Sequence, residues 1–346
     1  EIKSIGSSSH IEVHTKDVSV EAKDYRNKRT FSMLPSYLNV AFIHELKPDN
    51  SNWIRAHEEG SLYLEKTMGD QVVVQRFAGV GTGEMAEKAM EIAIKNGAEI
   101  IFATTAPMIR ACRRVAARHP EVKIFNCSVC MPYTEVRTYY SRIYEGKFIS
   151  GAIAGAITES DDIGYIASYP IYGVPAGINA FALGAQLTRP GAKIHLKWSC
   201  TESDPVKELR EKKIDVISSL DIPQQTSQNG QWGTFRLDSN GEAELIASPY
   251  WDWGAFYVQI TRSFLSREWD ASIFGKREDH AVNYWWGIAS GVVGLRWTDK
   301  IPDGTKALAN LLKEGIKDGT VDPFLRKIVS QDAVIRNDGK KVFDAD

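Results

Sequence analysis

The run Val40-Ala41-Phe42-Ile43-His44 is followed by Asp49-Asn50-Ser51-Asn52-Trp53-Ile54-Arg55-Ala56-His57-Glu58-Glu59-Gly60, and these two segments decide the fold class. The first is an apolar run typical of a buried strand. The second leads into a helical pattern that ends at Leu64-Glu65-Lys66. A strand, a polar loop with one large aromatic residue and then a helix form a ligand-binding edge in α/β proteins, because the loop lies at the carboxyl end of the strand and the helix offers unpaired N–H groups. The sequence therefore predicts an α/β fold with Trp53 at such an edge.

Two interpretations of Trp53 are open at this point. The indole is either a stacking platform for a flat ligand or a plug that packs the loop onto its domain. Pocket linings are often aromatic, whereas most tryptophans belong to cores, so position alone does not decide between them.

Composition limits the class of protein. A chain of 346 residues is long enough for two domains, and its net charge of -2, with scattered basic residues, argues against nucleic acid as a partner. No apolar run approaches the roughly 20 residues that span a bilayer. The chain begins at Glu1 without a signal-like segment, so we interpret it as a mature or trimmed form of a longer protein.

The pair Cys127-Ser128-Val129-Cys130 has the spacing of a redox or zinc half-site. It has no second CxxC and no HxxxH to complete a metal site. We favour a buried strand end that runs into a loop, since a free thiol behaves as a small hydrophobe. The sequence therefore predicts neither a metal nor a cofactor.

From Val40 onward the chain alternates between predicted strands and helices. Such alternation predicts a parallel sheet with right-handed crossovers. The strands are expected at residues 40–44, 72–77, 100–104 and 123–127, and the helices at 54–66, 83–96 and 107–119.

The pattern then restarts in a second half. Its strands are expected at 163–167, 193–198, 215–220, 232–237 and 245–248, and its helices at 174–187 and 205–212. A small-residue helix at 144–156 carries the chain across, and a helix at 257–265 carries it back. Two similar lobes with few crossings predict a hinged molecule with a cleft between the lobes. Residues 1–37 are interpreted as an arm or a linker, with short exposed strands at 11–14 and 18–21.

No motif in the chain forms a convincing catalytic set. Gly79-Val80-Gly81-Thr82-Gly83 lacks the GxGxxG spacing of dinucleotide sites and is interpreted as a turn. Asp161-Asp162 is interpreted as a solvated loop. His57 is interpreted as a polar helix residue at a domain edge, because no partner base or nucleophile is marked nearby. We therefore predict that the protein is not an enzyme.

Aromatic residues follow or end the strands of the second half. They are Tyr169, Trp198 and the pair Trp251 and Trp253, and Thr104-Thr105 ends a strand of the first half in the same way. Carboxyl ends of strands face the ligand in open α/β sheets, so hydroxyls and aromatics gathered there suit a flat polar heterocycle. Packing of the lobes themselves is the alternative, and for Trp251 and Trp285 it stays open.

Several ordered motifs give the chain a family resemblance from about Val40 to Phe324. It resembles the basic membrane protein family of substrate-binding proteins, which serve nucleoside- or purine-type ABC importers. It is most similar to the branch with a GWxxxHexG segment. The matching segments are Asn52 to Gly60, Ile101-Phe102-Ala103-Thr104-Thr105, Tyr139 to Gly146, Ile163 to Ala167, Gly177 to Ala185 and Trp253-Gly254.

This resemblance implies a type I periplasmic-binding-protein fold, with two Rossmann-like lobes joined by a hinge and a purine base held between aromatic residues. By position, Trp53 would be one stacking face, Thr104 and Thr105 would lie near the base, and Asp238 would accept hydrogen bonds from the base or ribose. The expected ligand-binding residues are Ser51, Asn52, Trp53, Thr104, Thr105, Tyr169, Trp198, Asp238 and Trp253. The expected divisions are residues 1–37 as the arm, 38–145 plus 254–296 as lobe 1, 146–253 plus 297–324 as lobe 2, and 325–346 as a tail.

The function expected from this resemblance is capture of a purine base or nucleoside outside the cytoplasm and delivery to an ABC permease. The protein would be anchored or periplasmic, would act as a monomer and would bind no nucleic acid. The alternative is the ligand-sensing domain of a larger receptor with a signalling partner. Two departures bear on the ligand: Asn52 replaces the usual glycine, and the loop from Asp221 to Gly230 is unlike the family pattern.

Overall fold

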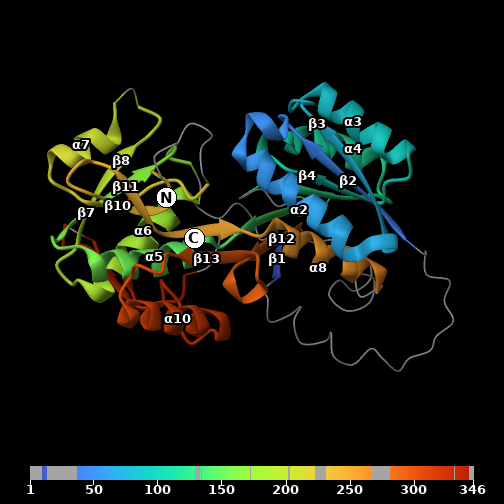
Figure 1. Cartoon of the computed structure of the whole chain (residues 1–346). Coiled ribbons are helices and arrows are strands. Elements are labelled where there is room, and N and C mark those ends of the chain that lie inside the picture. Colours follow the sequence, from blue (N-terminus) through green and yellow to red (C-terminus); the bar gives the residue numbers. More distant parts are fainter. Residues whose placement is uncertain are drawn as a thin grey trace. The chain divides into compact units, whose positions relative to one another are not determined.

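The computed structural model describes residues 10–13, 37–128, 133, 135–171, 173–201, 203–222, 231–266, 281–330 and 332–342. The chain divides into two compact units (Figure 1). Unit 1 contains residues up to Ser141 and Asp252–Trp286, and unit 2 contains Arg142–Trp251 and Gly287–Asp346.

Unit 1 is built on a seven-stranded sheet in which every neighbouring pair is parallel. The strand order is β1-β12-β6-β5-β4-β2-β3. The strands are β1 (His10–Val13), β2 (Leu38–His44), β3 (Val72–Ala78), β4 (Ile100–Ala103), β5 (Lys123–Cys127), β6 (Arg137–Ser141) and β12 (Ala281–Trp286).

Helices cover both faces of this sheet. Helices α3 (Glu84–Lys95) and α4 (Ile109–Arg118) pack together against one face, over Ala41 and Ile43 of β2. Helices α2 (Asn52–Met68) and α8 (Trp253–Leu265) pack together on the other, where Phe42 meets Tyr257 edge-on at 4.7 Å. Burial on both faces explains why β2 has a continuous apolar run instead of an alternating one.

The close approach of α2 and α8 depends on two glycines. A Cβ at Gly60 of α2 would lie 2.9 Å from Cβ of Trp253, and a Cβ at Gly254 of α8 would lie 2.6 Å from Cδ1 of Tyr63. Neither distance leaves room for a side chain, so the glycines allow the two helices to pack closely.

Unit 2 has a six-stranded mixed sheet in the order β13-β11-β10-β9-β7-β8. Strand β7 is parallel to β8 and β9, whereas the pairs β9–β10, β10–β11 and β11–β13 are antiparallel. The strands are β7 (Asp162–Ala167), β8 (Lys193–Trp198), β9 (Val216–Ser218), β10 (Thr234–Leu237), β11 (Ala243–Trp251) and β13 (Val293–Trp297).

The helices of unit 2 divide between the two faces of its sheet. Helices α5 (Ile143–Ile157) and α6 (Val174–Thr188) pack on one face, and α7 (Pro205–Glu211) packs against Ile217 and Phe235 on the other. The small residues of α5 serve its contact with α6, in which Gly151 and Gly184 lie against backbone atoms. Helix α10 (Asp303–Asp318) and the hairpin of β14 (Lys327–Val329) and β15 (Ile335–Asp338) complete the unit.

The chain changes units at places that differ from the expected boundaries. Trp253 begins a helix of unit 1, not of the second lobe, and residues 287–296 belong to unit 2. The tail contains the β14–β15 hairpin, and the arm contributes β1, which pairs with β12. The strand expected at 18–21 lies outside the described residues. Short 3-10 turns follow or precede strands of both units. Unit 1 contains η2 (Pro48–Asn50), η3 (Gly69–Gln71) and η4 (Ala106–Met108), and unit 2 contains η5 (Ile288–Ser290).

Candidate functional site

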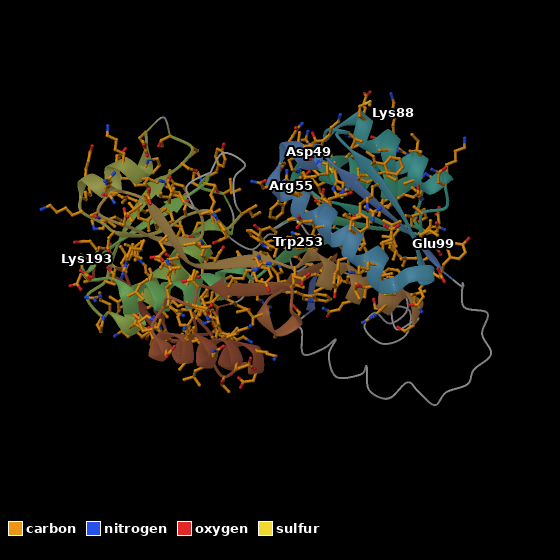
Figure 2. All side chains as sticks on the ribbon, viewed as in Figure 1. Asp49, Arg55, Lys88, Glu99, Lys193 and Trp253 are labelled. Carbon is orange, nitrogen blue, oxygen red and sulfur yellow. The ribbon has the colours of Figure 1, made fainter. Side chains whose placement is uncertain are left out.

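The segment from Ser51 to Gly60 is the first half of a helix and not a loop. The Ser51 hydroxyl oxygen accepts a hydrogen bond from the Ile54 N–H at 3.3 Å, so Ser51 is the N-cap and α2 begins at Asn52. Trp53, His57 and Gly60 then follow the i, i+4, i+7 spacing of one helix face. That face packs against α8, where His57 stacks on Trp253 and Gly60 leaves room for it (Figure 2 labels Trp253 at the start of α8). The family-like segment from Asn52 to Gly60 therefore forms a contact between two helices.

Trp53 is half-buried and held in one orientation. Its Nε1–H donates a hydrogen bond to the Thr104 carbonyl oxygen at 3.0 Å, just past the carboxyl end of β4. The rings of His57 and Trp253 meet the indole edge-on, with centroids at 4.9 Å and 5.7 Å. An aromatic ring that is fixed on its edges and partly exposed is preorganised for a stacking contact.

Tyr140 is a second partly exposed aromatic residue beside Trp53. It lies near the end of β6, and its ring is inclined 28° to the indole at a centroid distance of 6.3 Å. Tyr140 belongs to the family-like segment from Tyr139 to Gly146, but β6 was not among the strands expected from the sequence. The available signal was Thr138-Tyr139-Tyr140, a β-favouring run two residues after Val136.

Trp253 is part of the core instead of a cleft-facing residue. It is 1% exposed, and its indole stacks on the His57 ring at 4.6 Å with an interplanar angle of 16°. Tyr139 meets it edge-on at 5.7 Å. The prediction that Trp253 belongs to the second lobe is therefore wrong, because the residue lies in unit 1. Its buried ring packs edge-on against the Trp53 indole.

His57 is fully buried, which corrects its interpretation as a residue at a domain edge. Its Nδ1 shares a 2.6 Å hydrogen bond with the Tyr257 hydroxyl, which in turn lies 3.2 Å from the Tyr139 hydroxyl. Burial holds the pKa of His57 well below its usual value, and the neighbouring His44 acts in the same direction. The imidazole is therefore neutral near pH 7.

The hydroxyls of Thr104 and Thr105 differ in what they contact. The Thr104 hydroxyl donates to the Ile43 carbonyl at 3.1 Å and lies 3.0 Å from Nδ1 of His44, so both of its contacts are internal. The buried Thr105 hydroxyl has no hydrogen-bond partner among the residues that the structure describes, and the Thr105 carbonyl accepts from Nδ2 of Asn126 at 2.8 Å. Thr104 therefore ties β2 and β4 together.

In unit 2, Tyr169 and Trp198 lie where the sequence placed them, at the carboxyl ends of parallel strands. Tyr169 follows β7 and is 59% exposed. Trp198 ends the edge strand β8 and is half-buried against the core that α6 and β7 form.

Asp238 lies at the opposite edge of the unit 2 sheet. It follows β10, which is antiparallel to β9, so it sits beside the start of β9, where the Leu237 N–H bonds the Asp215 carbonyl. One oxygen of Asp238 accepts from the N–H groups of Asn240 and Glu242 at 2.8 Å and 2.9 Å. This carboxylate closes the β10–β11 turn, and the geometry does not support its predicted place in a ligand site.

Among the described residues, no group of three or more His, Cys, Asp or Glu side chains could hold a metal ion, and no helix is long and apolar enough to cross a membrane. Cys127 is buried at the end of β5 and forms no disulfide with another described cysteine, and burial raises the pKa of its thiol. Cys130 lies outside the described residues. A cavity of about 360 Å³ on the α4 side is lined by three arginines (Arg110, Arg113 and Arg114), Ala117 and Glu135, a poor match for a neutral heterocycle.

The family model for ABC transporter substrate-binding proteins of the PnrA-like type, Bmp, matches residues 38–227, more than half of the chain. The chain belongs to the Bmp family. A purine-binding protein of Brucella abortus is 27% identical over 308 residues, which cover 85% of each chain. A putative ABC transporter glucose-binding protein of Haloferax volcanii is 25% identical over 299 residues, 82% of this chain and 73% of that protein.

Solved structures agree with this Bmp protein in fold. A transcriptional activator of the comK gene from Bacillus halodurans has a TM-score of 0.64 at 15% identity, over 83% of this chain and 99% of that chain. An ABC transporter solute-binding protein from Conexibacter woesei has a TM-score of 0.60 at 14% identity, over 82% and 98%. The fold is therefore of the periplasmic-binding-protein type, as the resemblance implied. Family membership makes the chain a substrate-binding component of ABC transport, a role that is performed outside the cytoplasm.

Proposed function

We propose that this Bmp protein binds a purine base or nucleoside, with Trp53 as a stacking face, and delivers it to an ABC permease. In this proposal the protein acts as a monomer and leaves its ligand chemically unchanged. Ser51 and Asn52 begin the helix that presents Trp53, and Thr105, Tyr169 and Trp198 remain candidates for further contacts.

The observation that carries this proposal is the fixed, partly exposed indole of Trp53. Its hydrogen bond to Thr104 and its edge contacts to His57 and Trp253 leave it few alternative orientations. A ring held in this way loses little freedom when a flat ligand stacks on it. Tyr140 extends the aromatic surface beside it.

Two relatives suggest different ligand classes. The Brucella abortus relative is named for purine binding and the Haloferax volcanii relative for glucose binding. The aromatic surface at Trp53 favours the purine, because every base has a π-face on which to stack. One stack contributes about 1–3 kcal/mol, whereas micromolar binding needs about 8 kcal/mol, so polar contacts must supply the rest.

Titration calorimetry with purine bases, pyrimidine bases, their nucleosides and monosaccharides tests the proposal. We expect at least one purine compound to bind with micromolar or tighter affinity, and the sugars to bind more weakly or not at all. Binding of a monosaccharide without binding of any purine compound would overturn the proposed ligand.

Two further measurements address the rest of the proposal. Chromatography of nucleosides incubated with the protein should show no released base, and release at a rate proportional to protein concentration would reveal an enzyme. Light scattering during gel filtration should give the mass of one chain.

A further inference from the structure

A histidine and a glutamate lie next to the Trp53 anchor in unit 1. His44 ends β2 and is fully buried, and its Nε2 lies 3.0 Å from Oε2 of Glu58 in α2. Its Nδ1 lies 3.0 Å from the hydroxyl oxygen of Thr104, just past β4. The imidazole therefore contacts a helix through one nitrogen and the end of a neighbouring strand through the other, which fixes the orientation of the ring.

A closed ring of contacts results at the carboxyl edge of the unit 1 sheet. Strands β2 and β4 are parallel neighbours, so His44 and Thr104 lie side by side where the two strands end. Helix α2 completes the ring, because Trp53 donates to the Thr104 carbonyl and Glu58 contacts His44. These two attachment points lie five residues apart, about 7.5 Å along the helix axis. The ring therefore fixes α2 along its length as well as at the indole.

The hydrogens of this ring can be counted. The Thr104 hydroxyl donates its one proton to the Ile43 carbonyl at 3.1 Å, so it accepts from Nδ1–H of His44. The hydrogen bond between Nε2 of His44 and the Glu58 carboxyl group then needs a second proton. One proton is therefore shared between the imidazole and the carboxyl group.

The charge of Glu58 places that proton on the imidazole. The hydrogen bond to His44 is the main cause that lowers the pKa of Glu58, although burial acts against it, so the carboxylate is ionised near pH 7. Arg76 of β3 lies 3.6 Å from the other carboxylate oxygen and favours the same state. The contact between His44 and Glu58 is therefore a charge-assisted hydrogen bond, a kind about twice as strong as a neutral one.

Thr104 is the link between this pair and the indole. Its N–H and its hydroxyl both donate to the Ile43 carbonyl, each at 3.1 Å, and its own carbonyl accepts from Trp53. Without His44, a fully buried hydroxyl oxygen would lose the donor that it accepts from, which costs free energy unless Thr104 moves. A shift of Thr104 would displace the carbonyl that anchors the indole.

We infer that His44, paired with Glu58, is a positioning residue for the Trp53 stacking face. It acts through Thr104 and touches no ligand itself. The inference rests on the proposed function and deepens it, since it assigns the orientation of the stacking ring to a buried charged pair.

The test uses variants that break the ring at different points. His44→Phe keeps a ring and removes both hydrogen bonds, whereas His44→Asn keeps an N–H donor near the position of Nδ1. Glu58→Gln removes the charge of the pair, and Glu59→Gln is the matched control, because it makes the same change at the next residue of α2, which is exposed.

Two measurements are made on each variant. Calorimetry uses the purine compound that binds the wild type most tightly in the panel above. Hydrogen exchange of the Trp53 indole N–H is followed by NMR in protein with ¹⁵N-labelled tryptophan, and the signal is assigned by its absence in Trp53→Ala. The second measurement needs no ligand.

We expect the indole hydrogen of Trp53 to exchange at least about tenfold faster in His44→Phe, because local opening no longer has to break an anchored hydrogen bond. Glu58→Gln should show a smaller acceleration, and His44→Asn should stay closer to the wild type than His44→Phe does. Glu59→Gln should match the wild type in exchange and in affinity.

A double-mutant cycle separates positioning from general stability. Affinity in His44→Phe should fall by up to about tenfold, because a displaced indole gives up at most one stack. In the Trp53→Ala background the same substitution should change affinity by less than about twofold, since residues that act through one another are not additive.

Two results would overturn the inference. One is a wild-type exchange rate of the Trp53 indole in both His44→Phe and Glu58→Gln, and the second of these variants decides the matter if the first does not fold. The other is a loss of affinity that adds fully to that of Trp53→Ala. If the wild type binds no purine compound, the proposed function fails, and the exchange measurement still decides whether His44 positions the indole.

Discussion

The carboxyl edges of the two sheets differ in chemistry. In unit 1 the edge carries Trp53, whose indole is contacted edge-on by the uncharged rings of His57 and Trp253. The Tyr140 ring lies beside it.

In unit 2 the edge carries the buried ammonium of Lys147 and carboxylate of Asp221, with Tyr169 exposed nearby along the same edge. The edge of unit 1 offers a flat aromatic face to a ligand, whereas the charges of unit 2 are paired with each other inside that unit. We therefore expect changes at Trp53 to weaken the binding of every flat ligand, because a stacking contact has little selectivity.

The largest expected effect separates Trp253 from Trp53, which both belong to unit 1. Trp253→Ala should lower the free energy of unfolding by about 3–5 kcal/mol, because it removes a fully buried ring from the α2–α8 contact. Urea denaturation measures this loss. A loss below about 1 kcal/mol would show that Trp253 is not the support described here.

Trp53→Ala tests whether Trp53 contributes to ligand binding more than to stability. It should weaken purine binding about tenfold or more, the contribution of one stack, and should lower stability less than Trp253→Ala because Trp53 is only half-buried. Calorimetry and urea denaturation of the same variant provide both values. Unchanged affinity would remove Trp53 from the site.

The next effect concerns the pH dependence of stability. The pKa of His57 is depressed in the folded protein, so below about pH 6.5 the unfolded chain binds a proton that the folded chain excludes. Stability is therefore lost as pH falls below about 6.5, with a slope of up to about 1.4 kcal/mol per pH unit from this group.

The variant His57→Phe measures how much His57 contributes to this dependence of stability on pH. The variant keeps a ring against Trp253 but does not titrate, so its stability should fall less steeply than that of the wild type between pH 6.5 and 5. An unchanged slope in His57→Phe would mean that His57 is protonated in the folded state.

The smallest expected effect concerns Asp238 at the amino edge of unit 2. Asp238→Ala should leave ligand affinity unchanged and lower stability by no more than about 1 kcal/mol, through the loss of hydrogen bonds in an exposed turn. Calorimetry of this variant beside Trp53→Ala makes the comparison. A tenfold loss in Asp238→Ala would restore the role that the resemblance implied.

The sequence was sufficient to predict the fold class and the strand–helix order of unit 1 from β2 to β5. Those predictions rest on local signals, such as the continuous apolar run that begins at Val40. The unit to which Trp253 belongs depends on where the chain crosses between the units, and the direction of β10 depends on its antiparallel partners. Local periodicity reports neither of these long-range features. Trp253 was therefore expected in the second lobe, and Asp238 was expected at the carboxyl edge of the unit 2 sheet.

Missed residues have the same explanation. Lys147 reads as a polar position in a helix of small residues, and Asp221 lies 74 positions later in an irregular loop. Only the packing of α5 against the sheet brings them to 2.8 Å. Tyr140 was missed because β6 is the next element after β5 in the described part of the chain, which broke the alternation of strands and helices on which the prediction relied.

The most direct test of the central claim is a crystal structure with the tightest-binding compound of the calorimetric panel. We predict a purine ring stacked on the Trp53 indole at about 3.5–4 Å, the separation of carbon atoms in contact. A bound ligand with no ring against Trp53 would contradict the account.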